Sequence, residues 1–170
     1  MISVEYCQLL ARYNRWMNER LYAAAGGCSD EDRKRDRGAF FGSIHRTLNH
    51  ILWGDRMWLG RFTGSPCTVA PYGADMYGPF EALANERERT DTEILAWAGG
   101  LAPEWLATTL EYRAASDGRL RQLPAWIAAT HLFQHAAHHR GQVTTLFKQS
   151  GKGVGVTDLQ ALPGVVRILD

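Results

Sequence analysis

Apolar side chains recur at every third or fourth position in four long stretches of the chain, the spacing that places them on one face of an α-helix. The first stretch, 4–25, stops at Gly26-Gly27, and glycine is common directly after a helix. The others cover 39 to about 61, 79–98 and 124–151. The pattern therefore predicts four long amphipathic helices.

Two connecting segments have compositions typical of loops. Residues 28–38, "CSDEDRKRDRG", are charged, and Ser29 and Asp32 could cap a short turn there. This run is more typical of a solvated loop than of a nucleic-acid patch. Residues 63–79 are rich in glycine and proline and too long for a tight turn, so we expect them to form a wall or lid at one end of the bundle.

Three further signals complete the predicted fold. Alternation over 108–123 around Asp117-Gly118 predicts a small β-hairpin. Pro124 suits a helix start, because the first helical residue needs no backbone N–H. The Thr157–Gln160 spacing resembles a capping box and predicts a short last helix that ends at Pro163-Gly164. We expect an all-α four-helix bundle with a small hairpin insertion and a short C-terminal helix.

Length and composition narrow the class of protein. A chain of 170 residues is a natural size for one domain, here 1–170. A net charge of +1 gives no reason to expect nucleic acid or a membrane surface as partner. The start, "MISVEYCQLLARYNRW", lacks the features of a cleaved signal. Three cysteines without a CxxC pair favour a cytoplasmic location, and Cys67 has no neighbouring base that would make it a nucleophile.

All six histidines lie in two short segments of predicted helix. His50 is in the second helix, on a face with the small or polar residues Ser43, Thr47 and Gly54 and with Met57, which would leave room for a site. The fourth helix contains His135 and His139, and residues four apart lie on the same helical face.

If the second and fourth helices face each other, His50, His135 and His139 can bind one divalent metal ion. Three histidines leave coordination positions open for water, as in catalytic sites, whereas structural zinc sites are usually closed by four protein ligands. The competing interpretation is that these histidines serve packing or surface roles.

The other histidines fit the same ion less well. His138 lies about 100° around the helix from His139, and His45 is on a different face from His50. His131, one turn before His135, could be a fourth ligand or a supporting residue, and a hydrogen-bonded role within the bundle is favoured.

Three polar residues could support the ligands. Gln142 could orient a ligand imidazole through its second nitrogen, as metal-bound histidines require. Asp55 and Arg140 are close enough in sequence to do the same, although charges on the solvent side of a helix are a commoner explanation.

Several familiar motifs are absent. The chain has no HExxH, no Glu-x-x-His pair, no GxGxxG, no P-loop and no GxSxG, which weakens peptidase, ferritin-like, nucleotide-binding and serine-hydrolase interpretations. Four tryptophans, Trp16, Trp53, Trp58 and Trp126, fall within predicted helices and are expected in the core.

The segments "SIHRTLNHILWGDRMWLGRF" and "HLFQHAAHHRGQVTTLFKQSG" resemble the DinB family, named for damage-inducible bacterial members, and the resemblance covers essentially the whole chain. The stretches "RYNRWMNERLY", "YRAASDGR" and "TDLQAL" also resemble the family pattern. The resemblance implies an up-down-down-up bundle, frequently a homodimer, with a metal such as zinc or nickel on three histidines. These correspond to His50 in "TLNHI" and to His135 and His139 before "RGQ".

One part of the family pattern differs here. Where many members read NHQxHHRGQ, this chain has Gln134 and Ala136, which leaves the ligand positions intact but alters their surroundings and bears on the substrate.

The wider superfamily implies a chemistry. It includes mycothiol-dependent maleylpyruvate isomerase and bacillithiol transferases, in which a metal activates a low-molecular-weight thiol. The resemblance thus implies a hydrolase or thiol transferase in which a metal-activated thiol or water attacks a small electrophile, with the 63–79 loop beside the substrate.

Two alternatives stay open: a non-catalytic stress-response bundle that binds a metal or small ligand, and an interaction bundle without metal. An exchangeable metal ligand would favour the enzyme, and recruitment of His131 as a fourth ligand would favour storage.

Overall fold

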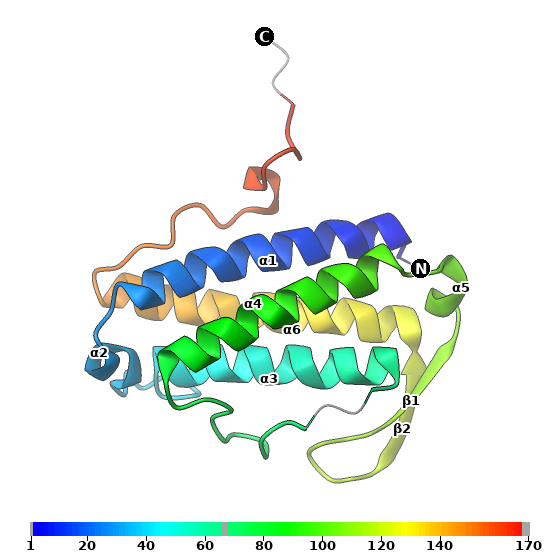
Figure 1. The fold of residues 1–170 in the computed structure, drawn as a ribbon, viewed down its shortest axis with the longest axis horizontal. Coiled ribbons are helices and arrows are strands. Elements are labelled where there is room, and N and C mark those ends of the chain that lie inside the picture. The colour runs from blue at the N-terminus through cyan, green and yellow to red at the C-terminus, as the bar shows by residue number, and fades with distance from the viewer. Residues whose placement is uncertain (1, 66–67, 168–170) are drawn as a thin grey trace.

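Four long helices lie side by side along one axis in the computed structural model, which describes residues 2–65 and 68–167 (Figure 1). They are α1 (Val4–Gly26), α3 (Ile44–Thr63), α4 (Phe80–Gly99) and α6 (Ala125–Gln149). Helices α1 and α6 run in one direction and α3 and α4 in the other, which is the up-down-down-up arrangement. The predicted four-helix bundle is confirmed.

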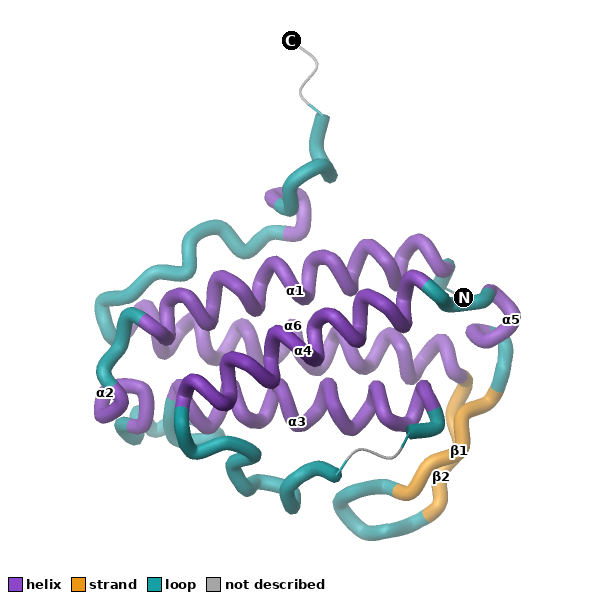
Figure 2. The backbone as a smooth tube through the Cα atoms, in the orientation of Figure 1, coloured by secondary structure: helices purple, strands orange, loops and turns teal. Residues whose placement is uncertain are grey.

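Each helix packs against two neighbours. Helix α1 lies mainly against α4 and α3 mainly against α6, while weaker α1–α6 and α3–α4 contacts close the ring. The parallel pair α3 and α4 requires a chain return along the whole bundle, and the long segment between them makes it (Figure 2). Within residues 2–65 and 68–167, no helix has both the length and the apolar character needed to cross a membrane.

Short elements lie at the two ends of the bundle. Helix α2 (Asp30–Lys34) follows α1, and Ser29 caps it by accepting a hydrogen bond from the Asp32 amide at 3.1 Å. Helix α5 (Pro103–Leu106), which the sequence pattern did not predict, leads into the hairpin. Strands β1 (Thr109–Arg113) and β2 (Leu120–Pro124) pair antiparallel, and this confirms the predicted hairpin.

The predicted start of the second helix is corrected. The second helix begins at Ile44, not at residue 39, because Gly42 adopts a positive φ of 76° and the Ser43 side chain caps the helix by accepting from the Arg46 amide. Phe40 and Phe41 therefore precede the helix.

The short C-terminal helix is a single 3-10 turn, η1 (Leu159–Ala161). No side chain caps it, and the Thr157 carbonyl instead accepts a hydrogen bond from the Tyr13 hydroxyl of α1.

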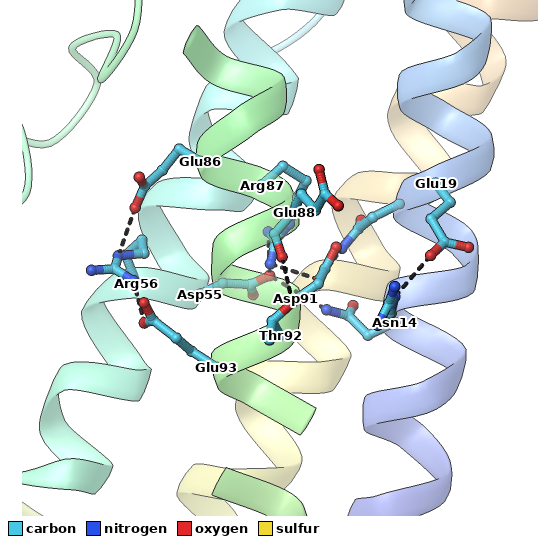
Figure 3. Close-up of polar contacts among 12 residues, drawn as sticks. Asn14, Glu19, Asp55, Arg56, Glu86, Arg87, Glu88, Asp91, Thr92 and Glu93 are labelled. Carbon is cyan, nitrogen blue, oxygen red and sulfur yellow. Dashed lines mark hydrogen bonds and ion pairs between the residues drawn. The ribbon is translucent and has the colours of Figure 1, made fainter. Parts of the chain in front are cut away.

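A layer of buried polar side chains lies between the two clusters of the apolar core. Figure 3 shows the polar contacts of this layer around Arg87 and Asp91. The Arg87 guanidinium of α4 donates to the carboxylates of Asp55 on α3, at 2.7 Å, and Asp91, at 2.8 Å. Asn18 of α1 also donates to Asp91, at 2.9 Å. Since a buried charge is costly unless paired, this layer constrains how α1, α3 and α4 align.

The same layer reaches α6 and corrects another expectation. Arg140 donates to the Asn14 side chain of α1, and both Arg140 and Asp55 are almost completely buried. The interpretation of Asp55 and Arg140 as solvent-facing helix charges is therefore wrong. Helical periodicity around one residue cannot show that its charge has a partner on another helix.

Replacement of Arg87 tests the weight of this layer. Arg87→Met keeps the length of the side chain but leaves two buried carboxylates unpaired, so we expect the free energy of unfolding to fall by about 3–5 kcal/mol. Urea unfolding measures it. The control is Arg89→Met on the same helix, whose side chain is 59% exposed and pairs with Glu86, with an expected loss below about 1 kcal/mol. Equal losses would contradict this role.

Candidate metal centre

Three histidines from two helices meet where α3 packs against α6. His50 comes from α3, and His135 and His139 lie one turn apart on α6, so that one nitrogen of each lies within 4.8 Å of the others. The Nε2 atoms of His50 and His135 are 3.1 Å apart. His50 and His139 are 7% and 8% exposed, and His135 is half-buried. The structure thus brings together the three residues that the sequence proposed as ligands.

The spacing of these nitrogens fits a shared ion. Two nitrogens bound at about 2.1 Å from one metal lie roughly 3.0–3.4 Å apart for right-angled to tetrahedral geometry. The observed 3.1 Å between His50 and His135 falls in this interval. Nδ1 of His135 is buried without a hydrogen-bond partner, whereas Nε2 of the same ring lies next to Nε2 of His50. Nε2 is therefore the candidate ligand atom of His135. The three histidines could therefore bind a metal ion.

Gln142 fixes the orientation of His139. Nδ1 of His139 donates to the Gln142 side-chain oxygen at 2.8 Å, and the Gln142 amide nitrogen donates to Nε2 of His138 at 3.2 Å. Because the amide oxygen can only accept, Nδ1 of His139 carries the proton and Nε2 keeps its lone pair. This is how metal-bound histidines are usually held.

The environment keeps the imidazoles in the neutral form that metals need. Burial, with a smaller effect of His139, lowers the pKa of His50 to about 4. Burial, with smaller effects of His139 and the other nearby histidines, lowers the pKa of His135 to about 3. Burial also lowers the pKa of His139, and the hydrogen bond that its Nδ1 donates to Gln142 opposes this effect. At neutral pH all three rings offer lone pairs.

Packing around the rings makes the cluster possible. A Cβ atom at Gly54 would lie 2.5 Å from Cε1 and 2.8 Å from Nδ1 of His135, so only glycine leaves space for that ring. Phe41 stacks on His50 with ring centroids 3.9 Å apart, and Trp53 stacks at 5.7 Å. Gly54, one of the predicted small residues beside His50, thus makes room for the His135 ring.

The remaining histidines lie outside the cluster. The His131 ring lies 5.1 Å from that of Trp58 and 5.8 Å from that of His135. His45 is buried and its Nε2 contacts the Tyr77 carbonyl at 2.9 Å, which ties the long loop to α3. His138 is exposed and contacts Gln142.

Asp55 does not support the ligands through any contact that the described part of the chain shows. Its carboxylate pairs with Arg87 and accepts from the Asn14 amide, both in the buried polar layer. Asp55 therefore aligns the helix that presents His50 instead of touching a histidine.

A cavity of about 550 Å³ opens from the histidines toward the hairpin. Several of its lining residues were not predicted: Phe41, which precedes its helix, Tyr72 of the long loop, Tyr112 of β1, and Arg61. The expectation that 63–79 borders the site holds for Tyr72, whereas Pro66 and Cys67 lie outside the described residues. The aromatic residues of the loop and hairpin were the available signal, but their position required the tertiary structure.

Gly54→Ala tests the close packing. The added methyl group must displace the His135 ring, so we expect zinc affinity to weaken by about 10–100-fold, the range seen when ligand positioning is lost. Competition with a chromogenic chelator measures the affinity. Gly141→Ala on α6 is the matched control, because a Cβ there meets no atom within 4 Å. Unchanged affinity in Gly54→Ala would show that His135 is not held this way.

The depressed pKa values predict how the stability of metal-depleted protein depends on pH. The unfolded chain protonates His50 and His135 near pH 6.5, whereas the folded chain protonates them only near pH 4 and 3. Their contribution is complete above about pH 6.5 and is lost as pH falls toward those values. We expect a loss of about 1–2 kcal/mol per histidine between about pH 7 and 5, measured by urea unfolding. His50→Asn/His135→Asn should flatten this slope, and an unchanged slope would refute the cause.

Comparisons with known proteins agree with the four-helix fold. Protein DinB of Bacillus subtilis (strain 168) is 23% identical over 154 residues, which cover 88% of each chain. The crystal structure of a DinB-like protein from Bacillus cereus ATCC 10987 has the same fold, with a TM-score of 0.62 and 20% identity over 82% of this chain and 89% of that one. The family model described as the DinB family matches residues 1–164. The chain therefore belongs to the DinB family.

Proposed function

We propose that this protein is a divalent-metal-dependent enzyme, with zinc or nickel on His50, His135 and His139, that attacks a small electrophile with a thiol or water. The observation that carries the proposal is the convergence of three neutral imidazoles at one end of a cavity of about 550 Å³. That volume is within the usual range of small-molecule sites.

The number of protein ligands supports catalysis over storage. In the described residues, the group of His, Cys, Asp and Glu side chains that could share an ion here has three members. The His131 ring centroid lies 5.1 Å from that of Trp58 and 5.8 Å from that of His135, and His131 is not in this group. A site with three histidines keeps positions for exchangeable ligands, whereas structural sites are closed by a fourth side chain.

A bound divalent metal would lower the pKa of a thiol or water and polarise the electrophile. The residues of this chain prepare the site for that chemistry. Gln142 keeps the proton of His139 on Nδ1, and burial keeps His50 and His135 unprotonated. Phe41 and Trp53 cover the faces of His50 and limit access of water from those sides.

A low-molecular-weight thiol is the proposed nucleophile. Tyr72 of the long loop lies beside His50, and the cavity extends from there to Tyr112 of the hairpin, so it has space for a thiol and an electrophile together. The electrophile could be an epoxide or an activated ring, both of which a thiolate attacks without a further cofactor.

Loss of one ligand tests the proposal. Untagged protein should contain about one divalent ion per chain by elemental analysis, and His139→Ala should lose it. The rate of thiol addition to an epoxide or activated ring should fall at least about 100-fold in that variant. Gln134→Ala, an exposed change on the same helix, is the control and should keep metal and rate.

Each adverse outcome has a distinct meaning. Equal turnover in His139→Ala would refute the proposed site. Stoichiometric metal without turnover of any thiol and electrophile pair would replace the enzyme by the non-catalytic metal-binding alternative. Background metal in both proteins after reconstitution would remove the metal centre.

A further inference from the structure

Arg61 lies in the same cavity as the three histidines but toward its other end. It follows His50 by eleven residues on α3, which is about 16 Å along the helix axis. Its guanidinium carbon is 4.5 Å from the ring centre of Trp58 and 4.3 Å from that of Tyr112. One N–H group donates to the Arg113 carbonyl at 2.9 Å. The α3 helix and the hairpin therefore hold Arg61 in place.

The charge of Arg61 has no compensating carboxylate. The cavity is lined by two charged side chains, Arg61 and Arg121, and by no acidic residue of the described chain. Arg121 pairs with Asp117 of the hairpin at 2.9 Å. Arg61 makes no ion pair within residues 2–65 and 68–167, and burial lowers its pKa. A guanidinium stays protonated in proteins, so this end of the cavity carries an unbalanced positive charge.

The surface between Arg61 and the histidines is largely apolar. Met57 and Trp58 of α3, Leu123 of the hairpin and Ile127 of α6 all line the cavity. Contact between this surface and an apolar part of a ligand stabilises binding, because both surfaces are removed from water. An anion without such a part would leave this surface uncovered.

We infer that the cavity binds a small organic carboxylate whose carboxylate group pairs with Arg61 and whose apolar body extends along α3 toward the three histidines. This inference rests on the proposed function in one respect, because the far end of the ligand is then presented to the metal. It names the substrate class of that site: an elongated carboxylic acid that reacts at the end remote from its charge.

The guanidinium suits this role chemically. Arginine has five N–H donors in a planar fork, and one hydrogen bond to the Arg113 carbonyl leaves others for a carboxylate. Stacking between Trp58 and Tyr112 fixes the plane of the fork in advance, which lowers the entropy lost on binding. Pairing with Arg61 also directs the carboxylate away from the metal, where it would otherwise compete with the nucleophile.

Octanoate and octanol are probes that differ only in the charged end. Calorimetric titration of the purified protein, in zinc-loaded and chelator-treated forms, gives the affinity ratio of the two. We expect octanoate to bind about tenfold or more tightly than octanol in both forms, as a charge-assisted hydrogen bond provides. In Arg61→Met the ratio should fall to about one while the octanol affinity changes less than about twofold, because methionine keeps an apolar contact with Trp58.

Arg121→Met is the matched control, since it removes a charge of the same cavity that Asp117 already compensates. The ratio should persist in this variant. The octanol affinity and the melting temperature report whether each variant keeps an intact cavity.

Two results would overturn the inference. The first is an octanoate preference that persists in Arg61→Met. The second is a preference that disappears on metal removal but not in Arg61→Met, which would place the carboxylate on the metal. An Arg61-dependent preference in protein that takes up no metal even after zinc loading would instead uphold the carboxylate site and refute the proposed metal chemistry, so the two failures are distinguishable.

Discussion

The close approach of α3 and α6 at Gly54 is the contact on which the candidate site depends. The absence of a side chain there lets the His135 ring lie against α3, and the same approach brings His50 within reach of His135 and His139. Close packing normally excludes polar rings from a helix interface, because a buried imidazole needs partners. Here Nε2 of His50 and Nε2 of His135 contact each other and His139 donates to Gln142, so the interface can be both tightly packed and polar.

A second polar feature, the Arg87-centred layer, holds the helices in the alignment that this interface requires. Asp55 follows Gly54 directly, and its salt bridge to α4 is almost completely buried. Sliding of α3 along the bundle would separate Asp55 from Arg87 inside a low-dielectric environment. The loss of this buried ion pair would cost more free energy than the loss of an apolar contact. Buried charges therefore position the helix whose other face presents His50, although they touch none of the histidines.

The cavity combines features that single helices do not have. One end offers neutral nitrogens for a cation, the other a guanidinium without a counter-ion, and the walls between them are mainly apolar. Besides α3 and α6, three separate elements line the cavity: the loop with Tyr72, the hairpin with Tyr112, and the segment before α3 with Phe41. This cavity suits a small molecule with two functional groups better than a macromolecule, because the two polar ends of the cavity lie inside one hollow.

The sequence by itself determined the four helices, the hairpin and the grouping of His50, His135 and His139 as candidate partners. These follow from local rules: apolar periodicity, turn-forming Asp117-Gly118, and the equivalence of positions four apart on a helix. Local rules failed where long-range packing overrides them. Helical spacing extended through Phe40 and Phe41, yet the positive φ at Gly42 interrupts it and frees Phe41 to stack on His50.

Only the tertiary structure decided which charges are buried and which side chains enclose the site. Asp55 and Arg140 resemble surface charges in sequence, and their partners Arg87 and Asn14 come from helices that are distant along the chain. Likewise, nothing local distinguishes Arg61 from other arginines, because its unbalanced charge depends on which side chains line the cavity, and no acidic residue of the described chain does. The sequence of a helix sets the direction in which a side chain points. Whether the charge of that side chain is compensated depends on the residues that other elements place beside it.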